Sequence, residues 1–387
     1  MSFHRRLFAY ACALSLFSSL HTARAENIST PLSGFSTLRK ALALKKKKTT
    51  TRTILGLPPC EEAEVWARPI ALGAYYFDNG RCAPGDSGAI SSFKQQMGRT
   101  PAVWMIYQSW TGWNQFPVIQ AQRAAALKST LMVTWEPWNG RRYDPVWNCQ
   151  NIVAGRYDNY IRSYARAVKS SGVPVLIRLA HEMNGDWYPW GTAYCGYTQR
   201  NNANSPAMFV AMWRHVVTLF KAEGADNAKW VWSPNILYTN GFNEQRQQER
   251  DLFSLYPGDK WVDWTGASVY NDGARRPWRS FSDLFDSTYR VLTLLSNKPI
   301  MIAEMGVTEQ GAPQGQTKAT WLQQALMNDI PQRYNRVRMV TYFSRDKSGM
   351  GESNYSLASS SSSLAVFRKV VNSSLYGGVL DYKTPPR

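Results

Sequence analysis

Residues 175–191 read VLIRLAHEMNGDWYPWG, and they indicate both an architecture and the location of a site. The first six residues, Val175 to Ala180, are almost all apolar, as expected for a short strand that is buried on both faces of a parallel sheet. His181 and Glu182 follow at once, and then a glycine and three aromatic residues. Polar and aromatic side chains at the end of a buried strand are typical of a binding cleft.

The same pattern occurs again later in the chain, where the apolar residues 299–303 are followed directly by Glu304 and a glycine two residues on. Between about residues 65 and 375, short apolar segments alternate with amphipathic helical ones. Strands are predicted at residues 70–75, 103–107, 129–133, 175–180, 230–232, 264–269, 300–303 and 338–341. The predicted helices include residues 157–170, 207–222, 281–295 and 316–327.

Eight strands with intervening helices predict an α/β protein with a (β/α)8 TIM barrel, in one domain that we place at residues 61–375. The alternative is an open, doubly wound sheet, which normally carries a glycine-rich phosphate loop after its first strand. Residues 73–76, Gly-Ala-Tyr-Tyr, are not such a loop. Residues 376–387 are predicted to form a C-terminal tail.

The first 60 residues differ in composition from the rest of the chain. Residues 1–25 resemble a secretory signal peptide, with a basic start, an apolar run from Leu7 to Leu20 and a small-x-small cleavage site at Ala23–Ala25. An uncleaved membrane anchor is the alternative. Residues 26–60 form a basic, flexible linker in our interpretation, because charge runs of this kind are usually solvated. We therefore expect a secreted or periplasmic protein.

The net charge of +18 comes partly from the linker, which holds seven of the basic residues against Glu26 between residues 26 and 55. A basic segment can hold a protein weakly against an anionic surface. No nucleic-acid-binding motif accompanies it, so we expect no nucleic acid as a partner. We expect a monomer.

Four cysteines remain once the signal is removed, an even number that favours disulfides in an exported protein. Four cysteines allow three pairings, and free thiols are a further alternative. We favour Cys60–Cys82 and Cys149–Cys195, because the second pair would join two loops at the same end of the barrel.

The carboxyl ends of the predicted strands are rich in aromatic, acidic and amide side chains. Aromatic residues make up 13% of the chain, with 16 tryptophans, which exceeds what packing usually demands. Large rings stack well on the apolar faces of sugars, so we predict a cleft that binds a polysaccharide. The predicted sugar contacts are His181, Trp187, Trp190, Tyr270, Trp110, Trp135 and Asn235.

Two glutamates that terminate strands four and seven suit retaining glycoside hydrolysis, in which the two carboxyl groups lie about 5 Å apart. Glu182 is the predicted acid/base, with a pKa raised by apolar neighbours and by the charge of Glu304. Glu304 is the predicted nucleophile, with Tyr270 as a hydrogen-bond donor. Glu136, after strand three, is a third carboxyl group that either orients a neighbour or binds a hydroxyl. Because only His181 and His215 remain in the mature chain, we expect no metal site, and we expect no cofactor.

These residues resemble glycoside hydrolase family 26, a clan A family, over about residues 65–370. The resemblance rests on Arg178 to Gly191, on the Trp-Ser-Pro-Asn of residues 232–235, on Tyr270 and on the Ile-Ala-Glu-Met-Gly of residues 302–306. It implies a (β/α)8 barrel and a retaining mechanism, with Glu182 as acid/base and Glu304 as nucleophile.

Most members of this family are similar to endo-β-1,4-mannanases, so a secreted endo-1,4-β-mannanase is our first expectation. Other members act on mixed-linkage β-glucan or β-1,3-xylan, and the basic charge leaves an acidic exopolysaccharide open. Clan members commonly carry a tryptophan near the end of strand eight, where this chain has Tyr342-Phe343. A non-catalytic polysaccharide-binding or export component is the alternative from a different class, and it would bind without turnover.

Overall fold

The computed structural model describes residues 69–77, 88–111, 115–142, 144–192, 194–195, 204–238, 242–377 and 379–380. All of them belong to one compact unit, Glu61–Arg387. The predicted signal peptide, the basic linker and both cysteines of the predicted Cys60–Cys82 pair lie outside the described residues.

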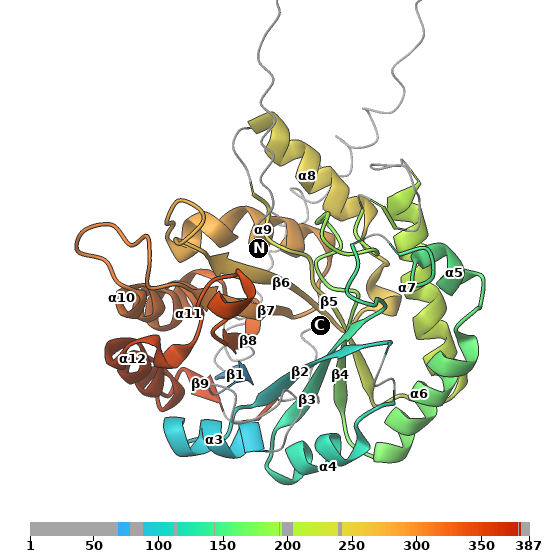
Figure 1. Ribbon diagram of the computed structural model, residues 1–387, viewed down its shortest axis with the longest axis horizontal. Coiled ribbons are helices and arrows are strands. Elements are labelled where there is room, and N and C mark those ends of the chain that lie inside the picture. Colours follow the sequence, from blue (N-terminus) through green and yellow to red (C-terminus); the bar gives the residue numbers. More distant parts are fainter. Residues whose placement is uncertain are drawn as a thin grey trace, which may run out of the picture. The chain divides into compact units, whose positions relative to one another are not determined.

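Eight parallel strands form a closed barrel, as the sequence predicts (Figure 1). Neighbours along the sheet follow the order β2-β3-β4-β5-β6-β7-β8-β1, and β1 also pairs with β2. The strands are β1 (Ile70–Tyr76), β2 (Val103–Ser109), β3 (Thr130–Glu136), β4 (Val175–Leu179), β5 (Ala228–Trp232), β6 (Trp264–Asn271), β7 (Ile300–Val307) and β8 (Val337–Ser344). Several extend further toward their carboxyl ends than predicted, because the backbone pairing continues past the apolar residues to polar ones at the rim of the barrel.

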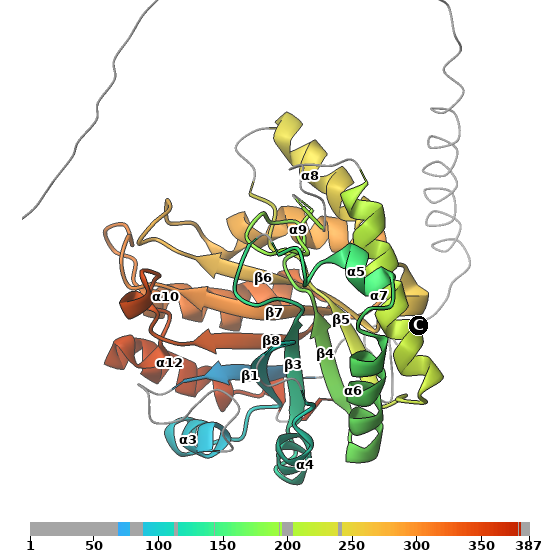
Figure 2. The same ribbon diagram turned by 45° about the vertical axis from the view of Figure 1, so that its right-hand side comes forward.

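The helices lie around the outside of the strands (Figures 1 and 2). They are α3 (Gly88–Met97), α4 (Val118–Ala126), α5 (Cys149–Val153), α6 (Asp158–Ser171), α7 (Ser205–Ala222), α8 (Phe242–Ser254), α9 (Phe281–Leu295), α10 (Lys318–Gln323), α11 (Ile330–Arg333) and α12 (Ser361–Val371). The predicted helix at 316–327 begins at α10 and continues through a π-helical turn, Gln324–Asp329, into α11. None of the helices in the described ranges combines the length and the apolar character needed to span a bilayer.

Side chains of serine and threonine set the starts of several helices. Ser280 and Asp283 form a reciprocal capping box at the start of α9. Ser360 caps α12 by accepting a hydrogen bond from the backbone of Ser363, 3.2 Å away, which accounts for the serine run in this region. After α12, the short strand β9 (Tyr376–Gly377) pairs with β1. The sheet therefore extends two residues beyond the border at 375 that the sequence suggested.

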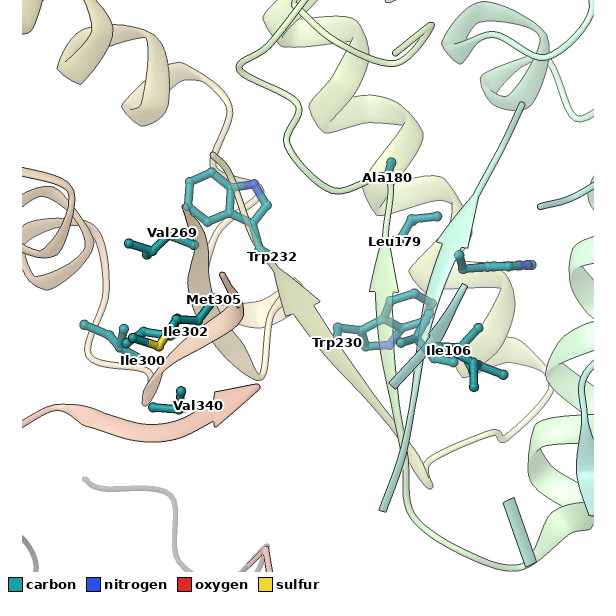
Figure 3. Packing of buried hydrophobic residues seen from close by; sticks show 14 of the residues in the cluster. Ile106, Leu179, Ala180, Trp230, Trp232, Val269, Ile300, Ile302, Met305 and Val340 are labelled. Atoms are coloured by element: carbon teal, nitrogen blue, oxygen red, sulfur yellow. The ribbon is translucent and has the colours of Figure 1, made fainter. Parts of the chain in front are cut away.

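Two hydrophobic cores position the strands. One fills the inside of the barrel with side chains such as Met105, Leu176 and Met339. The other lies between strands and helices and includes Trp230 and Ile302, which Figure 3 shows among their neighbours. Because each strand is buried on both faces, its sequence reads as a nearly continuous apolar run.

Candidate active site

A cleft of about 1050 Å³ lies at the carboxyl ends of the strands, and both predicted catalytic glutamates line it. Pockets for small molecules usually measure about 300–1,000 Å³, so this cleft has room for several linked sugars. Tyr75, Tyr107 and Phe343 also line it, from β1, β2 and β8.

The backbone just after β4 turns sharply to present Glu182. Ala180 and Glu182 adopt left-handed conformations, with φ of 44° and 54°, which non-glycine residues rarely do. Neighbouring strands hold this turn, because the Ala180 N–H donates to the Trp135 carbonyl at 3.1 Å and the Glu182 N–H donates to the Ser233 carbonyl at 2.8 Å. The strained turn directs the carboxyl group into the cleft, where it is nearly buried.

Gly185 allows Trp187 to reach the same carboxyl group. A Cβ at position 185 would lie 2.4 Å from the Trp187 ring, so only glycine fits there. The Trp187 indole N–H donates to Glu182 Oε2 at 2.9 Å. The glycine and the tryptophan of the sequence motif thus act together on the position of Glu182.

Glu304 lies in a bulge of β7. On the β6 side, Ala267 pairs with Ile302 while Ser268 pairs with Glu304, which leaves Ala303 as an extra residue. The pairing with β8 is also irregular between Ile302 and Met305. Bulges are common beside active sites because they redirect a side chain, and this one turns Glu304 into the cleft.

Both carboxylate oxygens of Glu304 have hydrogen-bond donors. The fully buried guanidinium of Arg178 forms a salt bridge with Oε1, and the Tyr270 hydroxyl donates to Oε2 at 2.5 Å. Arg178 also donates to the hydroxyls of Ser268 at 2.8 Å and Ser233 at 3.2 Å. Charge-assisted bonds of this kind are strong and hold the carboxylate in one orientation.

Glu182 is in a different electrostatic environment. Burial raises its pKa, and the negative charge of Glu304 raises it further. Arg178 and hydrogen bonds with Ser268 and Trp187 oppose the rise without cancelling it. The two carboxyl groups are therefore separated in role, with one paired to an arginine and the other favoured in its protonated form.

His181 is almost fully buried between these groups. Burial, and next the charge of Arg178, hold the pKa of its imidazole well below the usual range, so the ring is neutral at neutral pH. Its Nε2 lies 3.1 Å from the Tyr188 hydroxyl and 4.0 Å from Glu304 Oε1. The ring supplies a neutral polar surface beside the predicted nucleophile.

Of the seven predicted sugar contacts, four line the cleft: His181, Trp187, Asn235 and Tyr270. The other three, Trp110, Trp135 and Trp190, are wrong as sugar contacts, because their side chains are at most 1% exposed. Trp110 and Trp135 pack against each other and against tyrosines of α6 and the turn before it. Trp190 stacks on Tyr188 and donates its indole N–H to the His181 carbonyl at 2.7 Å. These rings support the cleft from behind.

Some lining residues were not predicted, among them Tyr107 and Tyr188. The role of Arg178 in binding Glu304 was also missed. A signal for it exists in the sequence, since an arginine within an otherwise apolar strand needs a buried partner of opposite charge.

The predicted disulfide between Cys149 and Cys195 is present, with the two Cα atoms 5.3 Å apart. It joins α5, which follows β3, to the loop after β4 that carries Trp187 and Trp190. Both cysteines are fully buried. The bond therefore anchors the loop that shapes one wall of the cleft.

The cleft of this TIM barrel holds two buried carboxyl groups. One is held by an arginine and the other has a raised pKa, which is the arrangement that glycoside hydrolysis uses. The family model described as Glycosyl hydrolase family 26 matches residues 148–361. This match covers more than half of the chain, and the chain belongs to that family.

Curated relatives carry two kinds of name. The chain is 33% identical over 289 residues to Endoglucanase H of Acetivibrio thermocellus, a match that covers 73% of this chain and 29% of that protein. It is 30% identical over 177 residues to a mannan endo-1,4-beta-mannosidase of Bacillus subtilis, with coverage of 46% and 40%. The chain thus spans less than half the length of these two relatives.

Solved structures share the fold. A mannanase from Bacillus subtilis superposes with a TM-score of 0.54 at 18% identity, covering 83% of this chain and 90% of that one. A modular endo-beta-1,4-mannanase from Cellulomonas fimi gives a TM-score of 0.60 at 17% identity, with coverage of 84% and 76%. At these identities the likeness establishes the barrel alone.

Proposed function

We propose that this protein is a retaining endo-β-glycanase in which Glu182 is the acid/base and Glu304 the nucleophile. The observation that carries the proposal is the difference in electrostatic environment between two buried carboxyl groups in one cleft. Arg178 and Tyr270 hold Glu304 by both oxygens, whereas the pKa of Glu182 is raised by burial and by Glu304.

In the first step, the Glu182 carboxyl proton passes to the glycosidic oxygen while a carboxylate oxygen of Glu304 bonds to the anomeric carbon and the bond to the leaving sugar breaks. In the second step, the Glu182 carboxylate takes a proton from water, and the water oxygen displaces Glu304 from the same carbon. Each step inverts the anomeric centre, so the product keeps the configuration of the substrate. Arg178 and Tyr270 keep Glu304 oriented throughout.

Endo action is supported by the volume of the cleft, which lies at the top of the range for ligand pockets. A polysaccharide chain can then bind on both sides of the catalytic pair.

A β-1,4-mannan is our first candidate substrate, because several relatives are named as mannan endo-1,4-beta-mannosidases. A β-glucan is the second candidate. The match to Endoglucanase H supports it, because that match is longer and has higher identity than the mannosidase match. The cleft also has Phe343 at the end of β8, where clan members commonly carry tryptophan. Mannose and glucose differ in the configuration of one hydroxyl, and such a difference changes the free energy of binding by only a few kcal/mol. Substrate assays are therefore needed to choose between mannan and glucan.

The test is product analysis on β-mannan, mixed-linkage β-glucan and β-1,3-xylan, with the anomeric form of the first product followed by NMR. We expect cleavage of at least one polymer with initial release of the β-anomer. Glu182→Gln and Glu304→Ala should each lower kcat by roughly 10²-fold or more. Single variants with wild-type rates, or initial release of the α-anomer, would refute the roles of the two glutamates. Binding without turnover by the wild type would favour the non-catalytic alternative.

We further propose that the protein acts outside the cytoplasm. The buried Cys149–Cys195 disulfide supports this location, since such bonds persist mainly in oxidising compartments. N-terminal sequencing of the mature protein should find cleavage after Ala25, and an intact N-terminus in the cytosolic fraction would refute the proposal.

A further inference from the structure

Five basic side chains line the cleft, and three of them form ion pairs. Those three are Arg142 with Asp186 at 3.8 Å, Arg275 with Asp272 at 2.7 Å, and Lys347 with Glu352. The other two are Arg276 and Arg345. Among the residues that the structure describes, neither has a carboxylate within ion-pair distance.

Arg345 follows β8 directly, and aromatic groups hold its guanidinium in place. The group lies over the Phe77 ring, 4.8 Å from the centroid. Its Nη1 is 3.5 Å from the Tyr75 hydroxyl, which is long for a hydrogen bond. Its Nη2 donates to Met350 Sδ at 3.5 Å, and a thioether sulfur is a weak acceptor. Its Nε is buried and has no partner. A planar set of donors is thus positioned in the cleft with little of its bonding capacity used.

Arg276 reaches the cleft from a different element, the segment between β6 and α9. It lies over the Tyr238 ring, with the guanidinium carbon 4.2 Å from the centroid. Stacking orients a cation without neutralising it. The two arginines therefore supply unpaired positive charge from two separate loops.

The carboxyl groups deeper in the cleft do not cancel this charge. Glu304 is already paired with Arg178. Burial, and next the charge of Glu304, raise the pKa of Glu136 to about 8, so this group is largely neutral at pH 7. The pKa of Glu182 is raised as well. Among the described residues that line the cleft, no carboxylate therefore compensates Arg276 or Arg345.

We propose that the substrate is an acidic β-glycan, with Arg345 binding a carboxylate carried by a sugar beside the reacting one and Arg276 providing a second cation for the same chain. The fork of a guanidinium matches a carboxylate in a bidentate manner, whereas a neutral glycan would leave both charges uncompensated on binding. This inference rests on the proposed function, because it names the substrate class of that cleft.

The experiment compares two forms of one polymer backbone, carboxymethylated and hydroxyethylated to the same degree of substitution, prepared from both β-1,4-glucan and β-1,4-mannan. Binding to the Glu182→Gln variant and hydrolysis by the wild type are measured in 25 mM and 500 mM NaCl. We expect the carboxymethyl form of the preferred backbone to bind about tenfold more tightly in low salt. The preference should shrink in high salt, because exposed charges are screened.

Three variants, each with one arginine replaced by glutamine, test whether the preference for the carboxymethyl form arises in the cleft. In the Glu182→Gln background, Arg345→Gln should remove most of the preference for the carboxymethyl form, and Arg276→Gln part of it. Arg156→Gln removes an exposed arginine outside the cleft lining and should leave the preference unchanged. Equal affinity for the two forms, or an equal loss of both in Arg345→Gln, would overturn the inference while leaving the hydrolytic function intact. Acid-selective binding without cleavage of any polymer would instead support the acidic site and refute the proposed hydrolysis.

Discussion

Three nearly buried carboxyl groups, those of Glu136, Glu182 and Glu304, line one cleft, and the fully buried guanidinium of Arg178 contacts one of them. Arg178 pairs with Glu304, whereas burial and the charge of Glu304 raise the pKa of the other two groups. The raised pKa of Glu136 is thus a consequence first of its burial and then of the charge of Glu304.

The substitution Glu136→Gln tests this arrangement through stability. The usual pKa of 4.5 applies in the unfolded chain, and the folded pKa is about 8. Between these values the folded protein holds a proton that the unfolded chain has lost, so the wild type loses stability as pH rises through this window. The glutamine has no proton to lose. We therefore expect the variant to gain roughly 3–4 kcal/mol over wild type between pH 5 and pH 8.

Urea unfolding of both proteins at pH 5 and pH 8 measures this difference. A difference between the proteins that stays constant with pH would show that Glu136 has an ordinary pKa in the folded state. The same pair of proteins, assayed for kcat/KM at pH 7, shows whether a neutral side chain at this position is sufficient for activity.

At the residue scale, the polar groups at the strand ends could be predicted from the sequence, but the exposure of each aromatic ring could not. Trp187 and Trp190 are three positions apart in the same motif, yet one lines the cleft and the other is buried. The difference depends on the strained turn at Glu182 and on the close approach of Trp187 to Gly185. Neither feature has a periodic signature in the sequence.

At the scale of elements, the loop after β4 is the most informative segment. It is held at its start by backbone bonds to neighbouring strands and near its end by Cys195. The eight barrel strands and the helices α6, α7, α9 and α10 could be predicted, because burial on two faces and amphipathic periodicity leave clear patterns. The bulge at Ala303 could not, because it arises from a mismatch with both neighbouring strands.

The Cys149–Cys195 bond should stabilise both the fold and the cleft. It closes a loop with a sequence separation of 46 residues, for which the chain-entropy model gives about 4 kcal/mol. We expect the double variant Cys149→Ser/Cys195→Ser to lose roughly 2–4 kcal/mol in urea unfolding. We also expect a lower kcat/KM, because the wall that carries Trp187 is no longer anchored.

Reductant provides the control for this prediction. Dithiothreitol should destabilise the wild type by a similar amount. Any remaining effect of dithiothreitol on the double variant would report the predicted Cys60–Cys82 pair. A double variant as stable and as active as wild type would show that the bond has no structural role.

At the scale of the whole barrel, closure depends on the pairing of β1 with β2, which involves Gly73 with Val103 and Ala74 with Trp104. A Cβ at position 73 would lie 2.9 Å from both the Cβ and the carbonyl oxygen of Val103 and 3.0 Å from Thr341 Oγ1. The count of eight strands predicted a closed barrel. The close contact between β1 and β2 at Gly73, which we call the seam, follows only from the packed structure.

Gly73→Ala should therefore disturb the closure of the barrel. We expect a loss of about 1–3 kcal/mol in the free energy of unfolding, because backbone atoms cannot move aside cheaply. Gly349→Ala is the matched control, since a Cβ there meets nothing within 4 Å, and its stability should stay within about 0.5 kcal/mol of wild type. A stable Gly73→Ala protein would mean that the seam can widen without cost.

The pairing of Arg178 with Glu304 has a consequence for any variant that lacks the second residue. In Glu304→Ala the guanidinium stays buried with only hydroxyls as partners, an unfavourable state for a charge. Azide or formate is small enough to occupy the space of the lost carboxylate and restore electroneutrality. Millimolar azide should thus raise the melting temperature of this variant and leave that of wild type unchanged. With an activated β-glycoside, the same bound ion should attack from the side of the missing nucleophile and yield an α-glycosyl azide.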